Sequence, residues 1–168
     1  HWLERNADLF SDTAKIVVPT LLSSWMQESL SLLGYDETDY ITIDDPCVTV
    51  KRLLIPSQID PVPEHVQWLQ SRMSAAVGQP EERARIYISR RNATKRRVRN
   101  ESEVVSALRT RGFERYVLEE LSVAEQIELF ADAEAVVGPH GAGFANLVYA
   151  EAPLVVELFG QKRLNTYH

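Results

Sequence analysis

The sequence has little cysteine and no long apolar run. Its 168 residues include one cysteine, Cys47, which excludes an internal disulfide framework and a multi-cysteine zinc site. No apolar stretch approaches the roughly 18–20 residues that span a bilayer. The start, His-Trp-Leu-Glu, does not resemble a secretory signal, and because it lacks Met we expect further residues upstream. These features favour a cytoplasmic protein, or one peripheral to a membrane.

Several catalytic motifs are also missing. The sequence contains neither Gly-x-Ser-x-Gly nor His-Glu-x-x-His, so serine hydrolases and zincin proteases have no support. No Asp-x-Asp motif stands in a convincing setting, because residues 36–39 read as an acidic turn, and no metal site is predicted. The dinucleotide fingerprint Gly-x-Gly-x-x-Gly is absent as well.

Charge is present in both signs but is unevenly distributed. The net charge of −6 disfavours binding of the whole protein to nucleic acid or anionic membrane. Residues 36–45 hold five acids and no base, whereas residues 90–99 hold six bases and no acid. With 45% hydrophobic and 25% charged residues, the composition is that of a globular domain.

The apolar pattern predicts two regions that meet near residue 60. The first contains strands at 15–19, 40–43 and 48–55, and a helix over 20–33 that Gly34 ends. The proline-rich residues 56–63 are the best linker candidate, and a helix over 64–77 follows them.

From residue 84 onward, strands and helices alternate. The pattern predicts strands at 85–89, 113–118, 135–138 and 153–159. Asn100 with Glu103, and Ser122 with Glu125, are typical of helix starts, and the second helix should bury Val123, Ile127 and Phe130. A loop and helix are expected over 141–150. The fold class is therefore α/β, a parallel sheet flanked by helices that binds its ligand at the carboxyl ends of the strands.

Three features lie at those carboxyl ends. The basic loop, residues 90–99, precedes a helix start and suits an anion, although it could equally be a solvated loop that balances acidic neighbours. The glycine block, residues 138–146 (GPHGAGFAN), would let backbone N–H groups and His140 approach a phosphate; the alternative is a tight turn with a hydrogen-bonded histidine. Glu157 ends a strand, where Rossmann units bind ribose, but by itself it reads as an exposed acid.

Together these segments resemble glycosyltransferase family 61. The resemblance covers about residues 85–159, with the block His-Gly-Ala-Gly-x-x-Asn following an arginine-rich loop. Phe144 stands where leucine is usual, and His-Trp-Leu at the start resembles a segment of the family's N-terminal half. The residues that the resemblance assigns to nucleotide-sugar binding are Arg90, Arg91, Arg97, His140, Gly141, Ala142, Gly143, Asn146 and Glu157.

The resemblance implies a GT-B fold, with residues 1–60 as part of an acceptor-side α/β domain and residues 61–168 as a Rossmann-like nucleotide-sugar-binding domain. It implies inverting transfer of a hexose or pentose from a UDP-sugar to a glycan or polysaccharide, without a metal or other cofactor, in a member of the prokaryotic capsular polysaccharide type. The candidates for the catalytic base are His140, His1 and Glu4. Family members carry more chain at both ends, so the 168 residues alone are expected to bind nucleotide without transferring sugar. The oligomeric state is left open.

Two other classes remain open. A dehydrogenase-type Rossmann domain would bind NAD, but its glycine fingerprint is missing. A non-catalytic nucleic-acid-binding module would use the basic loop, but that loop has no aromatic residue to stack on bases.

Overall fold

The chain forms two compact units. The structure, a computed structural model, describes residues 8, 14–45, 47–55, 62–78 and 83–160. The units are His1–Ala76 and Val77–His168. The division therefore lies after helix α3 (Pro63–Ser74). The sequence placed the boundary before this helix, near residue 60.

The first unit is built on a parallel strand pair. Strand β1 (Ile16–Pro19) pairs with β2 (Tyr40–Ile43), and α2 (Ser24–Leu32) connects them. Gly34, at φ +89°, follows the end of this helix as predicted. The predicted strand over residues 48–55 is wrong: the segment has no regular structure, and its large apolar side chains (Val48, Val50, Leu53 and Ile55) are exposed.

The second unit contains a four-stranded parallel sheet, which confirms the predicted α/β class. Its elements are β3 (Ala84–Ile88), α4 (Glu101–Arg109), β4 (Glu114–Tyr116), the 3₁₀ helix η2 (Leu118–Glu120), α5 (Val123–Ala131), β5 (Ala133–Pro139), the 3₁₀ helix η3 (Ala142–Tyr149) and β6 (Leu154–Leu158). The strand order is β4-β3-β5-β6, with β3 and β5 in the centre.

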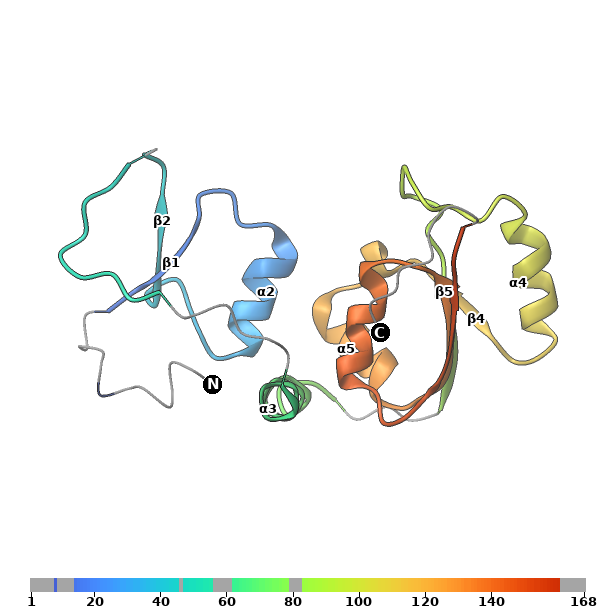
Figure 1. Cartoon of the computed structure of the whole chain (residues 1–168). Helices are drawn as coiled ribbons and strands as arrows, with labels where there is room; N and C mark the ends of the chain where they lie inside the picture. The colour runs from blue at the N-terminus through green and yellow to red at the C-terminus, as the bar shows by residue number, and fades with distance from the viewer. Residues whose placement is uncertain (1–7, 9–13, 46, 56–61, 79–82, 161–168) are drawn as a thin grey trace. The chain divides into compact units, whose positions relative to one another are not determined.

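Helices cover both faces of this sheet, α4 on one side and α5 on the other (Figure 1). Tyr87 and Val137 pack with Val105 of α4 in one cluster. On α5, Ile127 and Phe130 are fully buried, as their helical spacing predicted, while Val123 is only partly buried. The sheet thus has an apolar layer on each face, which is the arrangement expected of a parallel sheet.

Both helices begin where the sequence predicted, but only the second has the side-chain hydrogen bonds of a cap. Ser122 accepts a hydrogen bond from the Glu125 amide at 3.1 Å, and the Glu125 carboxylate accepts from the Ser122 amide at 2.7 Å, so the capping box is present. Asn100 occupies the N-cap position of α4 without capping it. Its side-chain amide instead donates to the Glu103 carboxylate at 3.1 Å.

Strand β5 is longer than predicted and takes in the first residues of the glycine block. Gly138 lies inside the strand, where a Cβ would come within 2.9 Å of the Ile88 Cβ. This glycine therefore serves the close approach of β5 to β3 and not a loop. The helical segment that begins inside the block, at Ala142, is the 3₁₀ helix η3.

Candidate functional site

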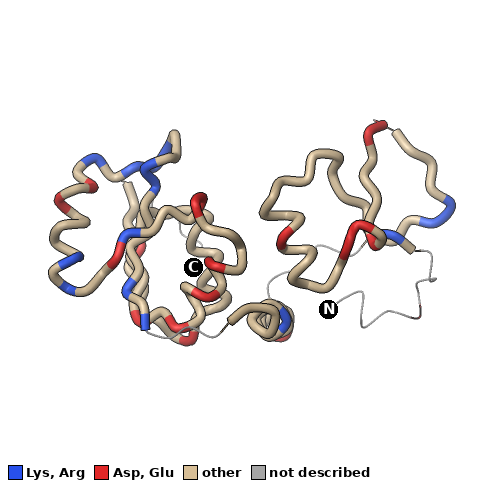
Figure 2. The backbone as a smooth tube through the Cα atoms, turned by 180° about the vertical axis from the view of Figure 1, so that it is seen from behind, with Lys and Arg blue, Asp and Glu red and all other residues tan. Residues whose placement is uncertain are grey.

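The strand order creates a topological switch point between β3 and β5. From β3 the chain moves outward to β4, whereas from β5 it moves the other way to β6. The loops that leave the carboxyl ends of β3 and β5 therefore diverge, and parallel sheets bind ligands at such points. The basic loop follows β3 and His140 follows β5, so both predicted loops lie at the switch point (basic positions in Figure 2).

Arg90 and Gly141 bring the two loops into contact. A Cβ on Gly141 would lie 2.4 Å from Nη1 and 3.2 Å from Cζ of Arg90, so the guanidinium occupies the space that any larger residue would fill. The Nε of Arg90 is buried and has no partner. Within the described parts of the chain, no acceptor pairs with this side chain, which leaves an uncompensated positive charge at the switch point.

Arg91, by contrast, is already paired. Its Nη2 donates to the two oxygens of Glu120 at 2.7 and 3.1 Å, and the Asn92 amide donates to the same carboxylate at 3.1 Å. Hydrogen bonds from Arg91 and Asn92 hold the pKa of Glu120 below its ordinary value. Arg91 thus joins the basic loop to η2, and a ligand phosphate would have to compete with Glu120 for it.

A small polar cluster fixes the point where the basic loop leaves β3. The Glu101 carboxylate accepts hydrogen bonds from Ser89 Oγ at 2.8 Å and from Tyr87 Oη at 3.1 Å. Ser89 Oγ in turn accepts from the Arg91 amide at 3.3 Å. Burial and the Glu101 charge raise the pKa of Tyr87, which keeps its hydroxyl a donor. The cluster ties the end of β3 to the start of α4.

Three contacts fix the position of His140. Its Nδ1 lies 2.6 Å from Glu157 Oε1, its ring stacks on Phe159 with centroids 4.9 Å apart, and its amide donates to the Leu158 carbonyl at 2.9 Å. A carboxylate at Nδ1 leaves Nε2 as the ring nitrogen available to a ligand. The side chains of His140 and Glu157 are 28% and 19% exposed, so the pair is accessible from solvent.

Gly143 and Asn146 of the glycine block make packing contacts within the second unit. A Cβ on Gly143 would come within 2.9 Å of Leu118 Cδ1, so this glycine lets η3 pack against the chain after β4. The Asn146 amide donates to Gln126 Oε1 at 2.9 Å, and the Gln126 amide donates to the carbonyls of Leu118 and Leu121. These contacts fix η3 against α5 and η2.

The predicted residues therefore separate into groups. Arg90, Gly141, His140 and Glu157 lie at the carboxyl ends of β3, β5 and β6. Arg97 and Ala142 are exposed and take no part in these contacts. His1 and Glu4 lie outside the described residues.

Three residues of the site were not anticipated: Glu120, Glu101 and Gln126. Their partners Arg91, Ser89 and Asn146 are 29, 12 and 20 residues away along the chain, so no local pattern could pair them. The one available signal was that Glu120 follows β4 and so belongs to the same edge of the sheet.

Among the described residues, no three His, Cys, Asp or Glu side chains gather in a way that could hold a metal ion. Over the same residues, no helix combines the length and the apolarity needed to cross a membrane.

Comparison with known proteins gives the family. The model of the family described as Glycosyltransferase 61 matches residues 1–156. The match includes the first unit and the basic loop and glycine block of the second, and it ends before Glu157. No match was found among curated proteins. The family supports glycosyl transfer as the general activity and a nucleotide sugar and a glycan as the partners. The chain therefore belongs to glycosyltransferase family 61.

Proposed function

We propose that the protein transfers a sugar from a nucleoside-diphosphate sugar, a UDP-sugar in the first instance, to a glycan or polysaccharide. The proposal includes inversion at the anomeric carbon, independence of metal ions, a GT-B arrangement and a role in capsular polysaccharide synthesis. The observation that carries it is the unpaired Arg90 guanidinium beside Gly141 and His140, at the switch point of the sheet.

The chemistry of the site suits a departing diphosphate. Glycosyl transfer leaves negative charge on the β-phosphate, and an enzyme without a metal must stabilise it with cations and N–H donors. Arg90 offers a fork of donors that no described residue occupies. The absence of a side chain at Gly141 makes room for this guanidinium, and Nε2 of His140, the ring nitrogen that Glu157 does not occupy, is available to the ligand.

Glu157 has two roles in this scheme. Its Oε1 lies 2.6 Å from His140 Nδ1 and so fixes the orientation of the ring, with Nε2 left for the ligand. Its second oxygen remains for a hydroxyl of the ribose, the contact that a strand-end acid makes in Rossmann units. In the absence of a ligand, Glu120 forms an ion pair with Arg91. When the nucleotide binds, Arg91 exchanges Glu120 for a phosphate oxygen.

Calorimetry with UDP tests the proposal. Arg90→Ala should weaken binding by about 10- to 150-fold, the equivalent of roughly 1.5–3 kcal/mol for a charged hydrogen bond. Arg109→Ala, an exposed arginine on α4, is the matched control and should bind as the unaltered protein does. Binding should persist in EDTA and should exceed that of NAD. Unchanged affinity in Arg90→Ala would exclude the switch point as the nucleotide site, and a strict need for Mg²⁺ or Mn²⁺ would refute the metal-free mechanism.

A further inference from the structure

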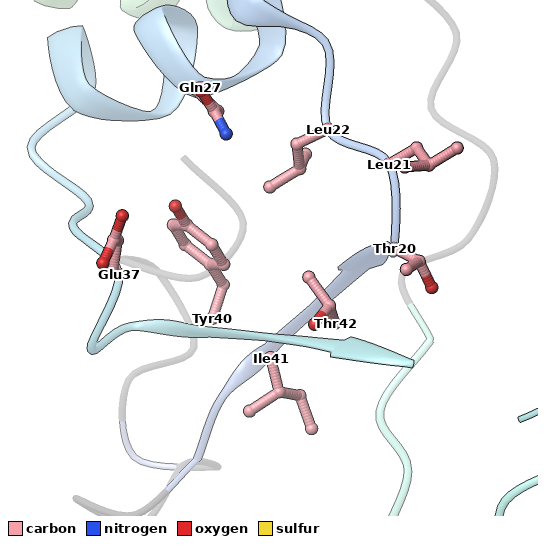
Figure 3. A pocket seen from close by; sticks show the side chains of 8 residues that line it. All are labelled: Thr20, Leu21, Leu22, Gln27, Glu37, Tyr40, Ile41 and Thr42. Carbon is pink, nitrogen blue, oxygen red and sulfur yellow. The ribbon is translucent and has the colours of Figure 1, made fainter. Parts of the chain in front are cut away.

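Ser89, the last residue before the basic loop, has a buried hydroxyl. Only 1% of the residue's surface is exposed, and a buried hydroxyl needs hydrogen-bond partners within the protein. The polar side chains of the first unit's pocket differ in this respect: Figure 3 shows Gln27 and Glu37 lining it, and both are exposed, so water can satisfy them. The hydrogen bonds of Ser89 are therefore the ones on which local structure depends.

The direction of the Ser89 hydroxyl follows from its partners. An ionised carboxylate can only accept, so the hydroxyl donates its proton to Glu101 Oε1, at 2.8 Å. The hydroxyl oxygen is left to accept, and the Arg91 amide donates to it at 3.3 Å. Hydrogen bonds in such a chain polarise one another, so donation to the carboxylate makes the oxygen a better acceptor. A directed chain of hydrogen bonds thus runs from α4 through Ser89 into the basic loop.

The backbone is held on both sides of Arg90. Before it, the Ser89 amide donates to the Tyr116 carbonyl of β4 at 2.8 Å. After it, the Arg91 amide is bonded to Ser89 Oγ. The Ala93 amide then closes a turn on the Arg90 carbonyl at 3.0 Å. These three hydrogen bonds restrict the backbone of Arg90, and one of them depends on the Ser89 hydroxyl.

The first turn of α4 is suited to hold the loop and not to bind the ligand. The amino end of a helix carries a partial positive charge and commonly binds anions. In α4 two carboxylates, Glu101 and Glu103, lie in this turn, so negative charge already offsets the helix dipole. A ligand phosphate is therefore left to the arginines of the basic loop, which Glu101 reaches through Ser89.

We propose that Ser89 and Glu101 are positioning residues for the nucleotide site: their hydrogen-bonded chain holds the basic loop in the conformation in which Arg90 lies over Gly141. The inference rests on the proposed function for the ligand, a nucleoside diphosphate, but the order of the loop does not depend on a ligand. Tyr87 provides an internal comparison. Its hydroxyl donates to the same oxygen of Glu101, at 3.1 Å, but the chain into the loop does not pass through it.

Calorimetry with UDP on two hydroxyl deletions in the whole chain tests the inference. Ser89→Ala and Tyr87→Phe each remove one hydrogen bond to Glu101 Oε1 and add no bulk. Ser89→Ala also frees the Arg91 amide, so it should weaken UDP binding about 3- to 10-fold, the effect of one hydrogen bond. Tyr87→Phe, the matched control, should change the affinity less than about twofold. Glu101→Ala should weaken binding as far as Ser89→Ala does, with no further loss in the double variant, and Glu101→Gln, which keeps an acceptor oxygen, should restore most of the affinity.

Amide hydrogen exchange gives a second readout that needs no nucleotide. Residues 90–93 should exchange about 3- to 10-fold faster in Ser89→Ala than in the unaltered protein, and Tyr87→Phe should leave their exchange unchanged. Equal UDP affinities in these two variants, or loop exchange that Ser89→Ala does not alter, would overturn the inference. If Ser89→Ala does not fold, Glu101→Ala compared with Glu103→Ala, an exposed acid of the same turn, gives the same test. If the unaltered chain binds no UDP, the proposed function fails, and hydrogen exchange alone decides whether Ser89 orders the loop.

Discussion

Replacement of Gly141 by alanine tests the contact on which the nucleotide site depends. The backbone at Gly141, with φ 170° and ψ 177°, is extended, so alanine fits without backbone strain. Its Cβ, however, would stand 2.4 Å from Arg90 Nη1. Because the clash involves the far end of a flexible side chain, the arginine should rotate away, and the free energy of unfolding should change by only about 0.5 kcal/mol.

The effect on ligand binding should be much larger than the effect on stability. With Arg90 displaced, Gly141→Ala should weaken UDP binding by about 10- to 150-fold, as far as Arg90→Ala does. The double variant should bind no more weakly than either single variant, because both changes remove the same interaction. Calorimetry on the four proteins of this cycle gives the coupling free energy directly.

Additive losses in the double variant would show that Gly141 and Arg90 act separately, and the argument from their contact would then be wrong. So would normal UDP affinity in Gly141→Ala. A large drop in stability would indicate that the alanine is accommodated by movement of β5 and not by rotation of Arg90.

Three further predictions concern stability and are measured by urea denaturation. Gly138→Ala should cost about 1–3 kcal/mol, since its Cβ would come within 2.9 Å of the Ile88 Cβ in the sheet; a neutral result would show that the strands can separate. Ser122→Ala removes the capping box of α5 and should cost about 1 kcal/mol. Hydrogen bonds from Arg91 lower the pKa of folded Glu120, so their contribution is present above the pKa of the unfolded chain and is lost as pH falls through the folded value. The stability difference between the unaltered protein and Glu120→Gln should therefore shrink on acidification, and a constant difference from about pH 6 to 3 would contradict this.

The parallel sheet could be predicted from the sequence because its strands are continuous apolar runs separated by helical patterns. Ile127 and Phe130 are buried on the helix face that their spacing indicated, and Ile86 and Val136 are buried within the predicted strands. The capping box at Ser122 was also readable, since its two hydrogen bonds join residues three positions apart.

The features that could not be predicted depend on tertiary neighbours. The apolar residues at 48–55 suggested a strand, but they are exposed in an irregular segment. Gly138 looked like part of a phosphate loop, yet its reason for being glycine is Ile88 of the adjacent strand. Arg90 and Arg91 likewise could not be distinguished from the sequence. The position of Glu120 in the fold determines that Arg91 is paired and that Arg90 is not.

The enclosure of the Arg90 side chain also affects how tightly an anion binds. A free arginine samples many rotamers, and ordering it on binding costs up to about 2 kcal/mol. In this protein the Arg90 guanidinium fills the space over Gly141 and its Nε is buried, so the side chain is partly ordered before a ligand arrives. The space at Gly141 therefore holds the arginine side chain in place. Less conformational entropy is lost when an anion binds, so more of the free energy of each hydrogen bond contributes to the affinity.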